Sequence, residues 1–164
     1  MIEMIDNDRQ HVCTFTGHRP ERLAFPEKDV ITWLKNEIKR AIDDGYTTFI
    51  SGMQRGVDLW AAEEVLRFRE AGENVQLVAA VPFRGMEQSW EEDWKIRYDQ
   101  VIKRSAEVIF VSNVPGRAAF FQRDHYMVDH ASRLLAVYSG GKGGTFETMN
   151  YAEKKKIEVI KYSK

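Results

Sequence analysis

The sequence predicts an α/β fold, a Rossmann-like three-layer sandwich whose mostly parallel sheet has about six strands. Short apolar runs alternate with segments of helical periodicity along the whole chain, which is typical of strand–helix–strand units. Glycine-bearing turns follow three of the expected strands, at Gly17, Gly52 and Gly140. The length of 164 residues, with 43% hydrophobic residues, fits one domain with a core of useful size. We therefore expect a single domain over residues 1–164, with an irregular lead-in at 1–10.

The first half of the chain alternates strands and helices. The expected strands are short apolar runs, and residues 75–81 form an almost unbroken one, typical of a strand covered on both faces. The expected helices repeat apolar residues at the spacing of one helical face, and each is followed by a glycine, Gly45 or Gly72, that suits a C-terminal cap. In order, these elements are expected at residues 11–16, 29–44, 46–50, 59–71 and 75–81.

The second half continues the alternation. Residues 86–104 are expected to be helical in part, and we interpret Trp90 and Trp94 as core residues, although an aromatic ring just beyond a strand could stack on a base. The last apolar run is expected at the edge of the sheet. Right-handed crossovers would place helices on both faces. The remaining elements, in order, are expected at residues 107–112, 118–131, 133–138, 145–155 and 157–162.

Charge and composition exclude several classes of protein and site. Lys and Arg number 24 and Asp and Glu 25, and the net charge of −1 gives no bulk attraction for nucleic acid or an anionic membrane. Cys13 is the sole cysteine, which excludes an intramolecular disulfide and a cysteine-built metal site. We interpret it as a small core residue. His125 and His130 are five residues apart and do not share a helical face, so no metal is expected.

The N-terminus and the cysteine content both indicate a cytoplasmic protein. The first nine residues carry acids where a secretory signal needs positive charge, and they lack the long apolar run of a membrane-spanning segment. A single cysteine suits a reducing compartment. Neither export nor membrane insertion is therefore expected.

Residues 138–148 are the most informative stretch. Gly140, Gly141, Gly143 and Gly144 fall within five residues, between an expected strand and an expected helix. Such a backbone can take positive φ and bring its N–H groups close to an anion, and the following helix would point its positive end at the same place. The alternative is a flexible turn with a glycine cap, and this stretch alone does not favour either interpretation.

The exit of the first strand is a second candidate anion loop. Gly17 permits a turn there, and His18 and Arg19 offer two potentially cationic side chains. A guanidinium fork suits phosphate or carboxylate, although both residues could equally be solvated turn residues.

The exit of the second strand carries Gly52 and Gly56 and ends at Asp58, where a helix is expected to begin. The Asp58 carboxylate could cap that helix or complement its dipole, which we favour slightly, or it could accept hydrogen bonds from a ribose-like diol. All three glycine loops lie at carboxyl ends of strands, where open α/β sheets bind ligands. Their convergence predicts a phosphorylated ligand.

Four segments carry a resemblance to a known family. They are Thr16-Gly17-His18-Arg19-Pro20, the block of residues 51–63 (SGMQRGVDLWAAE), Val81-Pro82-Phe83 and Gly143-Gly144-Thr145. Together they resemble the SLOG superfamily, and most of all its YpsA-like branch of bacterial and phage proteins. Relatives in the superfamily include DNA-processing protein A and the LOG phosphoribohydrolases. The resemblance covers residues 11–162, and the block 51–63 is its most specific part.

The resemblance implies a Rossmann-like fold whose glycine loops bind a nucleotide or nucleotide-derived ligand, with no other cofactor required. LOG enzymes carry Pro-Gly-Gly-x-Gly-Thr-x-x-Glu at the equivalent loop and cleave the N-glycosidic bond of a nucleoside monophosphate, using that glutamate and an arginine on the preceding helix. Here Ser139 stands in place of the proline and Thr148 in place of the glutamate. Glu147 would face another side of the helix, so recognition is favoured over hydrolysis.

We therefore expect a protein that binds a nucleotide-like small molecule, as a sensor or an accessory factor. Backbone N–H groups of the glycine loops would bind phosphate together with the Thr145 hydroxyl and the Arg19 guanidinium, and Asp58 would contact ribose. The expected ligand-binding residues are Gly17, His18, Arg19, Gly52, Met53, Gly56, Asp58, Pro82, Gly140, Gly141, Gly143, Gly144, Thr145 and Thr148.

Two other functions stay open. One is a nucleoside 5′-monophosphate N-glycosidase, with Arg123 and Glu147 as its catalytic pair. The other is a single-stranded DNA-binding module, which a near-neutral chain does not favour because such a module needs a basic groove. The resemblance also admits a homodimer.

Overall fold

The computed structural model describes residues 9–163. Residues 1–8 of the expected lead-in thus lie outside the described residues. The described part begins with a short 3-10 helix, η1 (Arg9–His11), whereas residues 9 and 10 were expected to be irregular. Across the described residues, six strands and five α-helices follow one another in the expected order. The α/β, Rossmann-like prediction is confirmed.

Within residues 9–163 the six strands form one parallel sheet in the order β4-β3-β2-β1-β5-β6. β6 lies at an edge, as expected, and β3 is buried along most of its length between β2 and β4. The strands are β1 (Val12–Gly17), β2 (Thr48–Ser51), β3 (Gln76–Val81), β4 (Glu107–Phe110), β5 (Arg133–Val137) and β6 (Glu158–Lys161).

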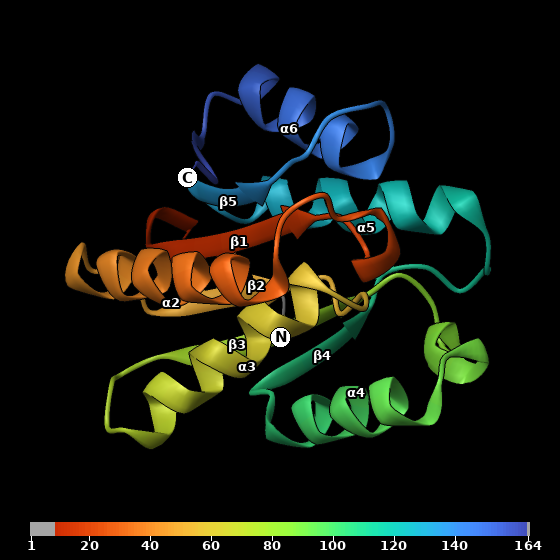
Figure 1. Cartoon of the computed structure of the whole chain (residues 1–164), viewed down its shortest axis with the longest axis horizontal. Coiled ribbons are helices and arrows are strands. Elements are labelled where there is room, and N and C mark those ends of the chain that lie inside the picture. The colour runs from red at the N-terminus through yellow and green to blue at the C-terminus, as the bar shows by residue number, and fades with distance from the viewer. Residues whose placement is uncertain (1–8, 164) are drawn as a thin grey trace.

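Helices cover both faces of the sheet. On one face α2 (Glu27–Asp43) packs on α3 (Val57–Glu70), which packs on α4 (Glu92–Arg104). On the other face α5 (Arg117–Asp129) packs on α6 (Gly144–Lys154). Figure 1 shows α2 and α3 in front of the strands and α5 behind β1. The three-layer prediction is confirmed. Among the described residues, no helix is both long enough and apolar enough to cross a membrane.

The larger part of the core lies under α2, α3 and α4, where Phe15 and Phe49 stack with ring centroids 6.2 Å apart. Smaller apolar clusters lie under α5 and α6, around Ile50 and Leu134. Cys13 is fully buried, as expected of a core residue, and burial raises the pKa of its thiol. In α2, the apolar face predicted from helical spacing is the face that packs into this core: Val30, Leu34 and Ile38 are all buried.

Two helices begin earlier than the sequence predicts. α2 begins at Glu27, directly after Pro26, whose fixed φ suits the residue before a helix. α3 begins at Val57, after Gly56. Both helices end as expected, because Gly45 and Gly72 follow them with φ of 99° and 103°, a conformation that glycine adopts at little cost.

The strand order creates a crevice beside β1. From β1 the chain builds β2, β3 and β4 in one direction along the sheet, and it then returns to place β5 on the other side of β1. The pairing of β1 with β5 runs from Cys13 with Arg133 to Gly17 with Val137, so both strands end together. The loops that leave them continue to helices on opposite faces, and ligands of open α/β sheets bind at such a divergence.

Candidate functional site

A cavity of about 810 Å³, here called the main cavity, opens at the carboxyl ends of β1, β2 and β5. Four segments line it: residues 15–22 at the end of β1 and just after it, Gln54 and Asp58 on either side of the start of α3, residues 116–124 at the start of α5, and residues 142–147 at the start of α6. In Figure 1 this is the right-hand end of the sheet, toward which the strand arrows point. The volume is that of sites that take small-molecule ligands.

The loop after β2 is held rigidly against its surroundings. Ser51 Oγ donates a hydrogen bond of 2.8 Å to the Asp58 carbonyl oxygen and accepts one of 3.1 Å from the Met53 N–H. Met53 is fully buried and has a φ of 66°, which is unfavourable for a residue other than glycine. A Cβ atom on Gly52 would lie 2.9 Å from both Arg123 Nη1 and Asp58 Oδ2. Packing, rather than contact with a ligand, therefore requires Gly52.

Arg123 ties α5 to this loop. Its guanidinium donates to the Gly52 carbonyl oxygen through Nη1 and to Asp124 Oδ1, at 2.7 Å, through Nε. The side chain is buried and borders the main cavity. Its first role is therefore to position two elements that lie 71 residues apart in the chain, and its charge lies at the cavity wall.

Asp58 does not cap α3. The residue before the helix is Gly56, and one Asp58 oxygen accepts a hydrogen bond of 3.3 Å from the Gln54 N–H instead. The slightly favoured capping interpretation is wrong, although Asp58 does lie in the first turn, where negative charge suits the helix dipole. Burial raises the pKa of its carboxyl to about 7; Arg123 opposes this rise and Asp124 adds to it. Near neutral pH the carboxyl is therefore partly protonated.

His18 joins the exits of β1 and β5. Its Nε2 accepts a hydrogen bond of 3.0 Å from the Ser139 N–H, so the ring is neutral and carries its proton on Nδ1. Burial, and after it the charge of Arg22, lower the pKa of His18. Of the two potentially cationic side chains, His18 is therefore neutral in this structure, because an imidazolium has no acceptor to offer the Ser139 N–H.

The glycines at the exit of β5 take the positive φ values predicted for them. Gly140, Gly141 and Gly143 have φ of 107°, 86° and 152°, and the Tyr138 hydroxyl donates to the Gly141 carbonyl oxygen at 2.6 Å. α6 begins at Gly144, as expected, and both Gly143 and Gly144 border the main cavity. Gly140 and Gly141 are exposed as well, but they do not border the cavity.

The two threonines of α6 have different surroundings. Thr145 is buried and borders the main cavity. Thr148 is also buried, but its hydroxyl donates to the Gly144 carbonyl oxygen at 2.8 Å and it does not border the cavity. Of the two hydroxyls, the one at Thr145 is therefore placed to meet a ligand.

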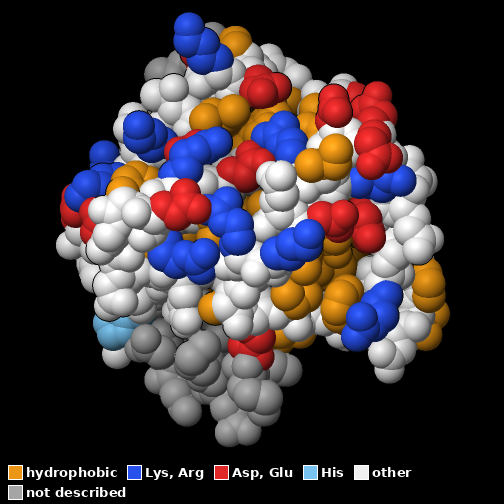
Figure 2. Space-filling model, turned by 90° about the horizontal axis from the view of Figure 1, so that it is seen from below, with side chains coloured by type: hydrophobic (Ala, Val, Ile, Leu, Met, Phe, Trp, Pro, Cys, Tyr) orange, Lys and Arg blue, Asp and Glu red, His pale blue; other side chains and the backbone are white. Residues whose placement is uncertain are grey.

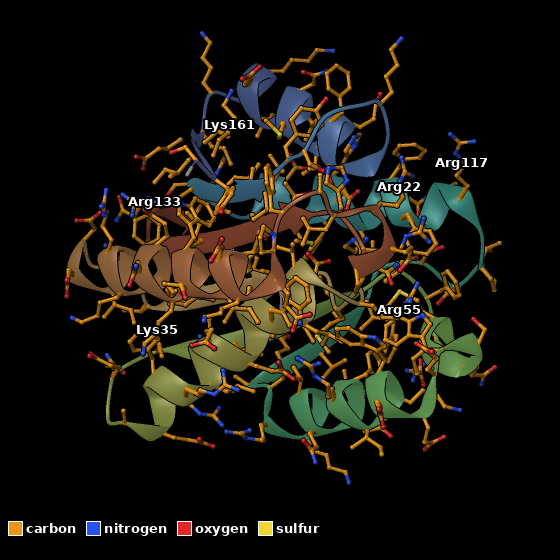
Figure 3. All side chains as sticks on the ribbon, in the orientation of Figure 1. Arg22, Lys35, Arg55, Arg117, Arg133 and Lys161 are labelled. Carbon is orange, nitrogen blue, oxygen red and sulfur yellow. The ribbon has the colours of Figure 1, made fainter. Side chains whose placement is uncertain are left out.

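Sequence reasoning missed three cationic side chains of the cavity wall: Arg22, Arg117 and Lys142. Figure 3 shows Arg22 and Arg117 at the same end of the molecule, whereas Lys35 lies toward the other end. Arg117 is the first residue of α5, directly after Pro115 and Gly116. The turn after the fourth expected strand also contains a glycine, Gly116. The reasoning that we applied to the other three glycine-bearing strand exits would therefore have found Arg117.

The wall of the main cavity carries more positive than negative charge. Among the described residues that line it, five are basic (Arg19, Arg22, Arg117, Arg123 and Lys142) and three are acidic (Asp58, Asp124 and Glu147). Within residues 9–163, no group of three or more His, Cys, Asp and Glu side chains is arranged to hold a metal ion. The site thus favours an anion held by side chains and backbone groups.

The structure brings about half of the expected site residues to one place. Those that border the main cavity are Gly17, His18, Arg19, Asp58, Arg123, Gly143, Gly144, Thr145 and Glu147. Those that do not are Gly52, Met53, Gly56, Pro82, Gly140, Gly141 and Thr148. Gly56 has a different reason to be glycine, because a Cβ on it would lie 2.8 Å from the His18 carbonyl oxygen. Which residues contact a ligand stays a prediction.

Relatives of known sequence share most of this chain. The UPF0398 protein BH1768 of Halalkalibacterium halodurans is 28% identical over 142 residues, which are 82% of this chain and 75% of that protein. UPF0398 proteins of Staphylococcus aureus are 28% identical over 108 residues, or 65% of this chain and 58% of theirs. The match therefore spans little more than half of the staphylococcal proteins.

Solved structures share the fold. DNA processing protein A from Helicobacter pylori superposes with a TM-score of 0.68 at 13% identity, covering 98% of this chain and 68% of that one. The same protein from Streptococcus pneumoniae gives 0.65 at 13% identity, with 94% and 51% covered. The Moco carrier protein of Chlamydomonas rheinhardtii gives 0.59 at 15% identity, with 93% and 76% covered. The structure of the Helicobacter protein concerns its binding of single-stranded DNA.

A family model covers almost the whole chain. The model described as YspA SLOG family matches residues 13–163, which include every strand and α-helix from Cys13 onward. The match includes all four segments on which the resemblance to the YpsA-like branch was based. This chain therefore belongs to the YspA SLOG family.

Proposed function

We propose that this chain binds a nucleotide or a nucleotide-derived ligand in the main cavity, as a sensor or accessory protein. One observation carries the proposal: α5 and α6 both begin in the wall of this cavity, beside exposed Arg19, Arg22, Arg117 and Lys142. The first N–H groups of a helix have no partner within it, and the helix dipole places partial positive charge there. Two helix starts and four cations make an anion site.

The start of α6 fits a phosphate group best. Gly143 and Gly144 leave the backbone uncovered, Thr145 offers a buried hydroxyl, and Lys142 adds a charge next to them. No described atom lies closer than 4.0 Å to the position that a Cβ of Gly143 or Gly144 would take. A ligand can therefore approach this backbone closely.

Asp58 fits a neutral, hydroxyl-bearing part of the ligand. Because its pKa is about 7, its carboxyl is only partly ionised at neutral pH and repels a phosphate less than an ordinary carboxylate would. It can also donate or accept a hydrogen bond, which suits a ribose diol. Family membership and the fold shared with DNA processing protein A support a nucleotide-related ligand.

Calorimetric titration with AMP, ADP, ADP-ribose and NAD tests the proposal. We expect binding of at least one of them, and Lys142→Ala should weaken it about tenfold, since a charge-assisted hydrogen bond contributes about 1.5–3 kcal/mol. Lys35→Ala is the matched control: it removes another exposed lysine, on α2, toward the opposite end of the molecule (Figure 3). No heat with any of the four at millimolar concentration would overturn the proposal.

A nucleoside 5′-monophosphate N-glycosidase is the second candidate. Asp58, Arg123 and Glu147 border one cavity, and an acid with a pKa near 7 is suited to proton transfer at neutral pH. Arg123 is already engaged by Gly52 and Asp124, which supports binding over catalysis. Chromatographic detection of free base from AMP or CMP, lost in Glu147→Ala or Asp58→Asn, would favour the enzyme.

A further inference from the structure

A second cavity of about 390 Å³ lies beside the main one. We call it the aromatic compartment, because Phe83, Trp90 and Phe120 line it. Arg19, Gln54 and Phe120 border both cavities, so the two spaces share a wall. A ligand in the main cavity therefore lies next to the aromatic compartment.

The rings of the compartment are held in place by their neighbours. Phe83 meets Phe120 edge to face with ring centroids 5.6 Å apart, and Trp90 meets Tyr98 in the same way, also at 5.6 Å. Tyr98 is buried, whereas Phe83, Trp90 and Phe120 are half-buried. The Arg55 guanidinium lies over the Trp90 ring and the Arg123 guanidinium over the Phe120 ring, so a ligand ring would pack against the half-buried remainder of these rings, beside the guanidinium groups.

The charges near this compartment are balanced, unlike those of the main cavity. The Arg55 guanidinium lies 5.9 Å from the Trp90 ring centroid and pairs with Glu21 at 3.0 Å. The same Glu21 carboxylate lies 3.9 Å from Arg19 Nε, and Glu91 adds a second acid to the wall. Arg55 Nε is buried and has no hydrogen-bond partner among the described residues. These surroundings suit a flat ring with polar edges and do not suit a phosphate.

We propose that the ligand is a dinucleotide, whose phosphates and first nucleoside occupy the main cavity and whose second ring lies in the aromatic compartment against Trp90. The inference rests on the proposed function and specifies the ligand class of the same site. A mononucleotide would leave the compartment empty. A longer single strand is disfavoured, because Glu91 lines the compartment and Glu21 pairs with Arg55 and Arg19 beside it, which reduces the attraction for a phosphate backbone. Figure 2, which views the molecule from below, shows acidic side chains interspersed among basic ones on that face.

Calorimetry with a ladder of ligands tests this assignment. NAD carries a positively charged nicotinamide ring where ADP-ribose carries a hydroxyl, and Glu21 and Glu91 offset the charges of Arg19 and Arg55 near the compartment. We therefore expect NAD to bind at least fivefold more tightly than ADP-ribose, the gain expected from one stacked ring. Trp90→Leu, which keeps an apolar side chain and removes the ring, should abolish that difference and leave the affinity for ADP unchanged. Trp33→Leu is the control, since Trp33 is also half-buried but contacts Tyr162 and borders neither cavity.

The outcomes separate the two proposals. If ADP binds but NAD binds no more tightly than ADP-ribose, or if Trp90→Leu weakens ADP and NAD equally, the dinucleotide assignment is wrong and the proposed function stands. If no nucleotide binds, both the proposed function and the dinucleotide assignment are wrong. A trinucleotide of thymidylate that binds more tightly than NAD, with the same dependence on Trp90, would replace the dinucleotide by a single strand. Phe83→Leu repeats the test should Trp90→Leu fail to fold, as judged by circular dichroism.

Discussion

The loops that leave β2 and β5 have similar sequences and opposite surroundings. Both carry glycines between a buried strand and a helix. The loop after β2 is buried at its start: Gly52 and Met53 are inaccessible, and a Cβ on Gly52 would meet Arg123 and Asp58, whereas Gln54 and Arg55 are half-buried. The loop after β5 is exposed from Gly140 to Gly144, and no described atom lies within 4 Å of a Cβ position on Gly140 or Gly141.

The difference shows that glycine has two roles in these loops. In the loop after β2 it makes room for protein atoms, and it allows α5 to be tied to β2 through Arg123. In the loop after β5 it provides positive φ and leaves the backbone uncovered. The first loop is a support and the second is a surface that a ligand can reach.

Adding one methyl group to each loop should give the largest difference. Gly52→Ala should lower the free energy of unfolding by about 3 kcal/mol, because its Cβ would lie 2.9 Å from Arg123 Nη1 and Asp58 Oδ2. Gly144→Ala is the matched control: its φ is not positive, and the nearest atom lies 4.0 Å away. Urea unfolding measures both; equal stability of the two variants would mean that the loop after β2 is not tightly packed.

The buried carboxyl of Asp58 should make stability depend on pH. With a pKa of about 7 in the folded chain and an ordinary value of 3.8 when unfolded, Asp58 binds a proton more strongly in the folded state between these values. Stability should therefore rise as pH falls from 8 to 5. Asp58→Asn should remove this gain. Between pH 8 and pH 5, the melting temperature of the wild type should therefore rise relative to that of the variant by at least about 2–4 °C, the shift that 1 kcal/mol produces in a domain of this size.

The comparison of wild type and Asp58→Asn also removes the effect of His18. Because the pKa of His18 is lowered in the folded chain, its contribution to the free energy of unfolding decreases as the pH is lowered. This decrease is the same in both proteins, so it cancels when their melting temperatures are subtracted. A difference in melting temperature that stays constant from pH 8 to 5 would show that Asp58 is ionised throughout.

The smallest effect on stability is expected in the exposed loop. Gly141→Ala should lower the free energy of unfolding by about 1 kcal/mol, because a side chain at a φ of 86° is strained although no described atom opposes it. Ligand affinity should be less affected than by Gly144→Val, since Gly144 borders the main cavity and Gly141 does not. Thermal unfolding and calorimetry measure the two effects; a loss at Gly141 as large as at Gly52 would contradict the distinction between the loops.

The fold could be predicted almost fully, because it depends on local patterns. The apolar stripe of α2 and the unbroken run of β3 are visible in the sequence, and chain order limits how parallel strands can connect. The element bounds differ from the predicted ones by up to two residues, as at the starts of α2, α3 and β2 and at the ends of β4 and α5, since element ends depend on backbone geometry rather than on periodicity.

The site could be predicted in part. Arg19, Asp58 and Thr145 were found because they follow glycines at strand exits, and all three border the main cavity. The neutral state of His18 could not be predicted, since it depends on the Ser139 N–H, which is 121 residues away in the chain. Arg22 and Lys142 were missed for a similar reason: exposed cations are common, and only the tertiary structure shows which of them face the same cavity.

The position of β1 between β2 and β5 also determines when the main cavity can first form during synthesis. During synthesis from the N-terminus, residues 9–110 can assemble β1 to β4 with α2, α3 and α4, while one edge of β1 stays unpaired until β5 at Arg133–Val137 has emerged. The start of α6, which belongs to the wall of the main cavity, emerges later still. The main cavity is thus incomplete until the start of α6 has emerged, and the proposed ligand can stabilise only chains in which β5 already pairs with β1.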